Sequence, residues 1–246
     1  MIKVYPDLES LSRAAAALLV EQASLAVAAR GRFSVALSGG STPRRAYELL
    51  AGLPFKEQAP WHRLHIFWGD ERCVPLDDPQ SNALMAREAW LDHVPIPAGQ
   101  IHFLNCATAP AEAARQYEAQ LRQFFAGRPP RLDLVLLGLG DNGHTASLFP
   151  GTPVLKETER WAAEVYVAEQ DMYRVTLTAP FINQAALVAF LVAGAAKAEV
   201  LRDILHGPRD PDRLPAQLIA PQSGEILWLT DLNAAARVKD EASYIA

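Results

Sequence analysis

The stretch LDLVLLGLGDNGHTASLFPGTP (residues 132–153) decides the fold class of this chain. It opens with an apolar run, Leu132–Leu137, that lacks the polar alternation of a half-exposed strand and suits a strand buried on both faces. Three glycines within residues 138–143 follow, and they indicate a loop whose backbone takes conformations that other residues resist. The loop ends at His144, which we therefore expect beyond the carboxyl end of a buried strand.

The same order, a buried strand and then a helix, recurs on both sides of this stretch. We expect strands at 2–5, 33–37, 64–68, 132–137, 162–167, 175–178, 187–192 and 226–229. We expect helices at 7–29, 43–50, 81–91, 110–125, 195–205 and 215–219. This alternation predicts an α/β fold with a mainly parallel sheet and helices on both faces. No connector is long or polar enough for a flexible linker, so residues 1–246 are predicted to form a single domain.

Ligands of open α/β sheets bind outside the carboxyl ends of the strands, so the residues that follow each strand are the candidates for a site. After strand 33–37 comes Ser38-Gly39-Gly40-Ser41-Thr42, with Thr42 as the predicted helix cap and Pro43 as the predicted first helical residue. The glycines and the free N–H groups of a helix start favour an anion, although a plain capped turn is equally consistent with the pattern. Arg44 and Arg45 would lie in that first turn, where an anion would offset their charge.

Charged residues also flank three other predicted strands. Asp70, Glu71 and Arg72 come directly after strand 64–68, where an Asp–Arg pair on a surface loop is the simpler interpretation. Arg174 precedes strand 175–178 with no predicted orientation, and Lys197 lies in the first turn of the helix after strand 187–192.

His144 is the strongest single candidate for chemistry, because imidazole exchanges protons near neutral pH with little driving force. The other histidines have no metal-ligand spacing, there is no GxSxG serine motif, and the glycines do not match GxGxxG. We therefore expect neither a metal site nor a dinucleotide site.

Composition limits the possible partners and the cellular compartment of the protein. The net charge of −5 comes without any basic stripe, which argues against nucleic acid as a partner. Cys73 and Cys106 are far apart and in no CxxC pattern, so we expect no disulfide and a reducing cytoplasm. No signal peptide is visible, and the longest apolar run, 185–196, is shorter than the about 20 residues that span a membrane. We expect a monomer or weak homo-oligomer.

Taken together, SGGSTP, GDERCVP with a downstream Ser81-Asn82, GLGxxGHTASLFPG, RVTLTAPxIN and FLVAGAAKAxVL resemble the 6-phosphogluconolactonase family in both motif and order. The resemblance spans residues 38 to about 205. It implies hydrolysis of 6-phospho-D-glucono-1,5-lactone to 6-phosphogluconate in the pentose phosphate pathway. It also implies a Rossmann-like sheet of the sugar-phosphate isomerase/deaminase type, with no cofactor.

Residue by residue, the resemblance implies a catalytic histidine at His144 and substrate-contacting arginines at Arg72 and Arg174. It implies phosphate binding by Lys197 and by the loop Gly39, Gly40, Ser41 and Thr42. One position departs from the family pattern, because Asn142 stands where the family has aspartate, and Asp141 precedes it.

Two alternatives remain open at this point. An amino-sugar-phosphate isomerase or deaminase would need a carboxylate such as Asp70 to take a proton from carbon, and the HTASLFP continuation speaks against it. A non-catalytic sugar-phosphate sensor would be expected to have a damaged histidine loop or an attached DNA-binding segment.

Overall fold

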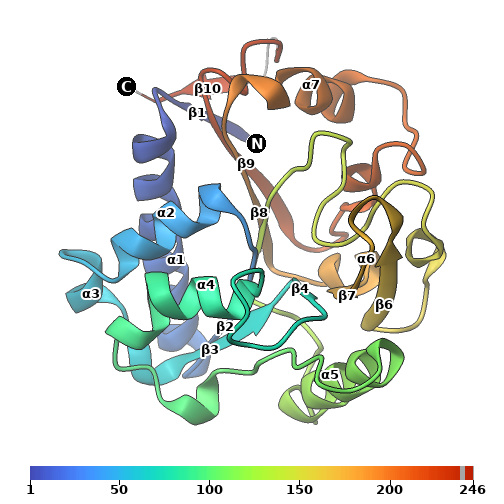
Figure 1. Ribbon diagram of the computed structural model, residues 1–246. Coiled ribbons are helices and arrows are strands. Elements are labelled where there is room, and N and C mark those ends of the chain that lie inside the picture. The colour runs from blue at the N-terminus through green and yellow to red at the C-terminus, as the bar shows by residue number, and fades with distance from the viewer. Residues whose placement is uncertain (239–241, 246) are drawn as a thin grey trace.

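A parallel sheet of seven strands organises the molecule (Figure 1). The computed structural model describes residues 1–238 and 242–245. The strands lie in the order β10-β1-β9-β8-β5-β2-β3, and every neighbouring pair is parallel. Their bounds are β1 Ile2–Tyr5, β2 Phe33–Leu37, β3 Leu64–Trp68, β5 Leu134–Leu137, β8 Leu187–Val192, β9 Glu225–Asp231 and β10 Ala242–Tyr244. This confirms the predicted fold class.

The α-helices cover both faces of this sheet. Their bounds are α1 Leu8–Arg30, α2 Ser41–Leu50, α3 Phe55–Gln58, α4 Asn82–Ala89, α5 Pro110–Phe124, α6 Ala179–Ile182 and α7 Ala198–His206. Short 3₁₀ turns lie at Trp61–Arg63, Leu91–His93, Ala98–Gln100, Pro153–Lys156, Ala168–Gln170, Ala195–Lys197 and Pro215–Leu218. Helices α1, α2 and α4 pack on one face, and α5 packs on the other (Figure 1).

Two apolar cores therefore sandwich the sheet. Along β2, Val35 and Leu37 enter the core beneath α1 and α2, whereas Ala36 enters the core beneath α5. All five residues of β2 are buried, as expected for a central parallel strand with helices on both sides.

A second, three-stranded antiparallel sheet has the order β4-β7-β6, with β4 Asp70–Arg72, β6 Ala162–Val167 and β7 Met172–Leu177. Residues 70–72 form strand β4, so the expectation of a surface loop there is wrong. Strand β7 is longer than expected and includes Arg174, which was expected to precede it. In this pairing Asp70 lies opposite Thr176 and Arg72 lies opposite Arg174. A strand of three charged residues has no apolar pattern, so only its pairing with β7 reveals it.

Helix α1 begins after Asp7, whose side chain accepts a hydrogen bond from the Ser10 N–H at 2.8 Å. Among the described residues, α1 alone is long and apolar enough to span a membrane by length and composition, which corrects the expectation that no segment would be. The many alanines raise its mean hydropathy without producing an unbroken apolar run. In the structure 44% of the most apolar 18-residue stretch of α1 is buried. The core helix of a soluble protein and a signal sequence both reach the same length and mean hydropathy.

Candidate active site

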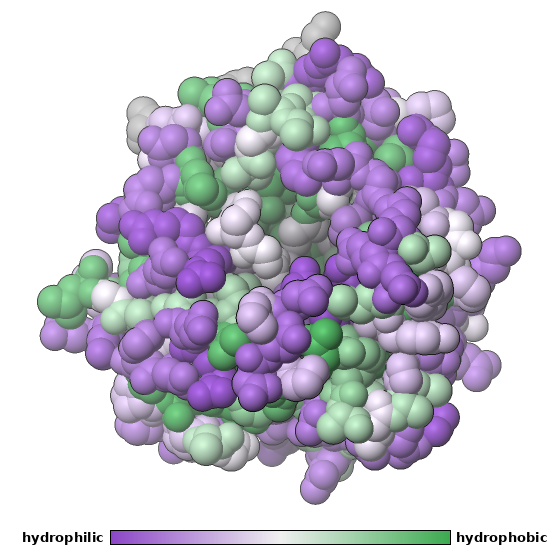
Figure 2. Space-filling model, in the orientation of Figure 1, coloured by the Kyte–Doolittle hydropathy of each residue, from purple (hydrophilic) through white to green (hydrophobic). Residues whose placement is uncertain are grey.

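The crevice between β2 and β5 is the point at which the chain reverses direction across the sheet. From β2 the chain continues to β3 on one side, and from β5 it continues to β8 on the other. Crevices at such positions, outside the carboxyl ends of the strands, are the usual ligand sites of open α/β sheets. Figure 2 shows this face hollowed near its centre, with a mainly hydrophilic rim.

A cavity of about 260 Å³ opens here. Its lining residues are Ser38, Gly39, Gly40, Asp70, Arg72, Asn82, Gly138, Leu139, Gly140, His144, Thr145, Ala146, Arg174 and Lys197. The cavity therefore brings together most of the residues singled out in the sequence. Ser41 and Thr42 instead line an adjoining cavity of about 180 Å³ together with Gly39, Gly40 and Lys197.

The loop after β5 is folded tightly around the histidine. The Gly140 N–H donates to the His144 carbonyl at 2.9 Å, which closes the loop. A Cβ atom on Gly140 would lie 2.0 Å from Nδ1 of His144, so only glycine leaves room for the ring. On its other side the imidazole stacks on Phe149, with the ring centroids 4.0 Å apart.

Asn142 orients this imidazole. Its Oδ1 lies 2.6 Å from Nδ1 of His144 and also accepts the His144 backbone N–H at 3.2 Å. Since an amide oxygen only accepts, Nδ1 carries the proton and the neutral ring leaves Nε2 as its basic atom. Burial lowers the pKa of His144 to about 4, a shift that Asp70 partly opposes. The ring is therefore neutral at pH 7.

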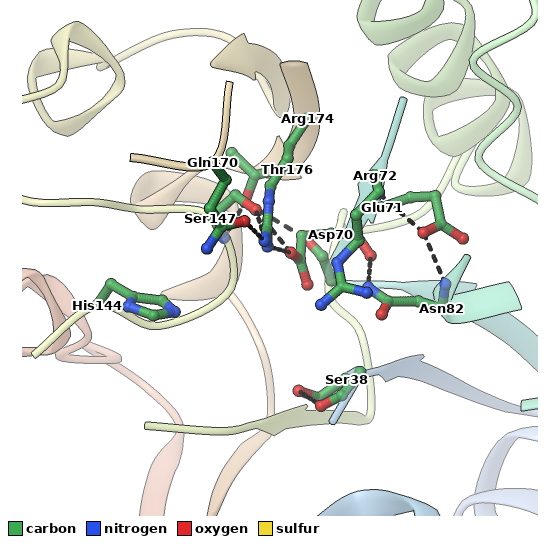
Figure 3. A network of polar contacts seen from close by, with 12 residues as sticks. Ser38, Asp70, Glu71, Arg72, Asn82, His144, Ser147, Gln170, Arg174 and Thr176 are labelled. Carbon is green, nitrogen blue, oxygen red and sulfur yellow. Dashed lines mark hydrogen bonds and ion pairs between the residues drawn. The ribbon is translucent and has the colours of Figure 1, made fainter. Parts of the chain in front are cut away.

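Behind the histidine loop lies a buried polar network (Figure 3). Asp70 accepts a hydrogen bond from the Ser147 hydroxyl at 2.6 Å, and its Oδ2 lies 3.4 Å from Nη1 of Arg174. The Asp70 and Arg174 side chains are both 7% exposed, and Arg174 also donates to Gln170. The expected Asp–Arg surface pair is therefore wrong, because the antiparallel pairing of β4 with β7 buries these side chains.

Glu71 is buried on the opposite side of β4 and fixes the start of α4. Its carboxylate accepts the backbone N–H groups of Arg72, Asn82 and Ala83, each at 2.8 Å, and the Ser81 hydroxyl at 3.0 Å. Burial raises the pKa of Glu71, while these hydrogen bonds act in the opposite direction.

Two further contacts shape the mouth of the cavity. Nη1 of Arg72 donates to the Gln80 carbonyl at 2.6 Å, which directs the guanidinium along the rim. A Cβ atom on Gly39 would lie 1.9 Å from Oδ1 of Asn82, so the loop after β2 can approach α4 only with glycine there.

The start of α2 differs from the expectation in detail. The helix begins at Ser41 after Gly40, so Thr42 is not its cap and Pro43 is not its first residue. Ser41 and Thr42 thus lie in the first turn, where backbone N–H groups have no partner within the helix and favour an anion.

The two arginines of α2 are paired with carboxylates. Arg45 pairs with Glu9 at 2.6 Å and with Glu48 at 3.0 Å, and Arg44 pairs with Glu48 at 3.3 Å. Their charges are therefore offset by carboxylates on α1 and α2 without any bound anion.

Lys197 lies where the two cavities adjoin. It lines both cavities, and its ammonium group forms an ion pair with Asp141. Lys197 is 22% exposed and Asp141 is 74% exposed. At position 142, where the family pattern has aspartate, the side chain of Asn142 contacts the imidazole. The aspartate one residue earlier, Asp141, pairs with Lys197 instead.

Cys73 and Cys106 form a disulfide, with their Cα atoms 4.9 Å apart, which corrects the expectation of two separate thiols. Cys73 directly follows β4, and Cys106 lies ahead of α5. Their separation of 33 residues in the sequence concealed this proximity.

A larger cavity of about 500 Å³ lies at the opposite edge of the sheet, near the starts of β5 and β9, and among its lining residues only Arg131 is charged. Within residues 1–238 and 242–245, no group of three or more His, Cys, Asp or Glu side chains is placed to hold a metal ion.

Sequence reasoning missed Ser147, which gives no signal of its own. The place of Asp70 directly after a buried strand makes it a candidate, but nothing in the sequence indicates that it is buried against Ser147 and Arg174.

Comparison with known proteins gives a consistent result. Residues 6–228 match the model of the family described as glucosamine-6-phosphate isomerases/6-phosphogluconolactonase. A 6-phosphogluconolactonase of Synechocystis sp. is 49% identical over 85% of this chain and 86% of its own length. One of Nostoc sp. is 44% identical over 96% of this chain and 98% of its own length. The solved 6-phosphogluconolactonase of Trypanosoma brucei superposes with a TM-score of 0.88 at 30% identity, covering 97% of this chain and 98% of that one.

Proposed function

Because the chain belongs to the glucosamine-6-phosphate isomerase/6-phosphogluconolactonase family, we propose that it hydrolyses 6-phospho-D-glucono-1,5-lactone to 6-phospho-D-gluconate. One observation carries the proposal. A neutral imidazole and an anion pocket open into adjoining cavities that share Gly39, Gly40, Gly138, Leu139 and Lys197. A molecule with a phosphate at one end and an electrophilic carbon at the other would place its two ends in these two cavities.

The proposed reaction begins with a water molecule whose proton passes to Nε2 of His144 as its oxygen attacks C1 of the lactone. The bond between C1 and the ring oxygen then breaks, and the same proton passes from His144 to the ring oxygen. One water molecule is consumed and a carboxylic acid is formed, which ionises in solution. Arg72 and the N–H groups of nearby loops are the donors proposed for the developing negative charge on the carbonyl oxygen.

Binding of the phosphate is assigned to Gly39, Gly40, Ser41, Thr42 and Lys197. The first-turn N–H groups of α2 and the ammonium of Lys197 would provide hydrogen bonds and positive charge at one position. Arg174 is proposed as a second substrate contact, because it lines the cavity beside Asp70. Holding the phosphate fixes the lactone carbon relative to His144, which is the larger part of what a reactive lactone needs from an enzyme.

The deciding experiment is a coupled assay in which lactone is generated freshly by a dehydrogenase and its opening is corrected for the spontaneous rate. Purified protein should accelerate opening at substoichiometric concentration. Ammonia release from glucosamine 6-phosphate, without acceleration of lactone opening, would favour the deaminase alternative and contradict the proposal.

We also propose that the enzyme acts in the cytoplasm as a monomer or weak homo-oligomer, without cofactor, metal, nucleic acid or membrane as a partner. The acidic net charge of −5 supports a small-molecule substrate over nucleic acid. Trapping of thiols in intact cells would show whether Cys73 and Cys106 carry their disulfide there, because a reducing cytoplasm favours thiols.

A further inference from the structure

The Asp70 carboxylate uses only one of its two oxygens within the protein. Both the Ser147 hydroxyl and the Arg174 guanidinium contact Oδ2. Within the part of the chain that the structure describes, no group donates a hydrogen bond to Oδ1, and this atom is not sealed from solvent. Figure 3 shows the carboxylate facing the space that His144 borders, and Asp70 lines the cavity.

This arrangement matters because the proposed reaction turns His144 into a cation for part of the cycle. A general base is effective only if its protonated form is stabilised while it holds the proton. Asn142 offers the imidazole an amide dipole but no negative charge. Arg174 and Lys197 both disfavour a positive charge on His144.

Two carboxylates could offset these cations, and they are not equivalent. Each is paired with a cation, but Asp141 is 74% exposed, so solvent weakens its effect on the ring. Asp70 is buried, where charges interact more strongly, and it is attached through Ser147 to the loop that carries the histidine. Of the two, Asp70 has the larger influence on the pKa of His144.

We propose that Asp70 is a positioning residue for this reaction: it stabilises the imidazolium of His144 from across the cavity, in place of a carboxylate at position 142. The inference depends on the proposed role of His144 as general base. It assigns Asp70 no proton transfer of its own. The remaining charged groups near Asp70 are Arg72 and Glu71 on β4, and Glu71 is held by the start of α4.

The test compares the pH profiles of wild type, D70N and D70N/N142D in the lactone assay. D70N should lower kcat at pH 7 by about 10-fold, the equivalent of one pKa unit in imidazolium stability. It should also shift the acid limb of kcat/KM to lower pH, since loss of the negative charge makes His144 harder to protonate. Adding a carboxylate beside Nδ1 in D70N/N142D should move the acid limb back and restore most of kcat.

The matched control is S147A, which removes a hydrogen bond to the same oxygen but keeps the charge of Asp70. Its acid limb should stay at the wild-type position. The proposal is overturned by a D70N acid limb that does not move, by an increase in KM alone, or by a kcat loss that N142D does not restore.

D70N leaves Arg174 as an unpaired buried charge, so this variant could fail to fold. In that event D70N/R174M removes both charges, and an NMR titration of the His144 ring replaces kinetics. Compared with R174M, which keeps the Asp70 carboxylate, D70N/R174M should have a lower titration midpoint. An unchanged or higher midpoint overturns the proposal. The titration needs no activity, so a protein without lactonase activity would refute the proposed function separately.

Discussion

His144 combines a fixed orientation with a lowered basicity. Its ring is held between Phe149 and Gly140, and Asn142 fixes the tautomer through Nδ1. Burial keeps it unprotonated at neutral pH, as a general base requires.

Replacing this side chain tests its role directly. H144A should lower kcat by about 10²–10⁴-fold, the usual contribution of general acid–base catalysis, while the circular dichroism spectrum and Tm stay near wild type. The exposed His62 provides a control, and H62A should keep full activity. Near wild-type turnover in H144A would remove the histidine from the mechanism.

Lys197 is the second residue whose role can be isolated. K197A should raise KM about 10- to 100-fold and weaken competitive inhibition by inorganic phosphate, because a charge-assisted hydrogen bond contributes about 1.5–3 kcal/mol. The effect on kcat should be smaller, since the proposed role of Lys197 is to hold the non-reacting end of the substrate. K56A, on the exposed surface of α3, is the matched control. An unchanged phosphate inhibition constant in K197A would place the anion elsewhere.

At the level of elements, the short strand β4 links the two halves of the site. One of its faces directs Asp70 towards β7 and the histidine loop, and the other directs Glu71 towards the start of α4. Because strand residues alternate between faces, two consecutive carboxylates serve two different structural tasks. Arg72 then continues to the rim of the cavity.

E71Q should expose how much α4 depends on this strand. The amide cannot accept all the N–H groups that the carboxylate binds, and its own NH₂ group would face donors. A loss of about 2–3 kcal/mol in unfolding free energy is expected, with a Tm about 4–10 °C lower. The comparison is E57Q, a change on the exposed surface of α3. A Tm equal to that of E57Q would show that Glu71 is dispensable for folding.

At the scale of the whole molecule, three partly buried histidines make the free energy of unfolding dependent on pH. Burial lowers the pKa of His65 to about 4 and also lowers that of His102, and the two rings lie 3.2 Å apart at their nearest nitrogens. Burial also lowers the pKa of His144 to about 4. The unfolded chain, with histidine pKa values near 6.5, therefore binds more protons than the folded protein between pH 6.5 and 4.

The contribution of these histidines to the free energy of unfolding should consequently be fully present above pH 6.5 and should decline as the pH falls towards 4. Chemical denaturation between pH 7 and 5 should show this decline, by no more than about 1.4 kcal/mol per pH unit for each histidine. Glu71, whose pKa is raised, acts in the opposite direction near the acid end. H65Q should reduce the slope of unfolding free energy against pH, and a slope equal to that of wild type would contradict the role given to His65.

We also propose that residues 1–246 form one domain, which predicts a single cooperative unfolding transition.

The sequence alone determined the parallel sheet and the family. Runs such as Phe33–Leu37 and Leu187–Val192 are apolar on both faces, and their strand bounds match the structure because burial by two helix layers permits hardly any other composition. His144, the glycine loop and Lys197 were identified because residues that follow buried strands meet at one edge of the sheet. Family membership, predicted from the order of the motifs, is confirmed.

Only the tertiary structure decided how the charged residues are used. Asp70, Arg174 and Ser147 are separated by up to 104 residues, and nothing local to any of them indicates a shared buried network. The pairing of Cys73 with Cys106, the ion pairs of Arg44 and Arg45, and the partner of Asp141 were hidden for the same reason. Hydrophobic periodicity reports which face of an element is buried, whereas the partner of a charge depends on which elements the folded chain places beside it.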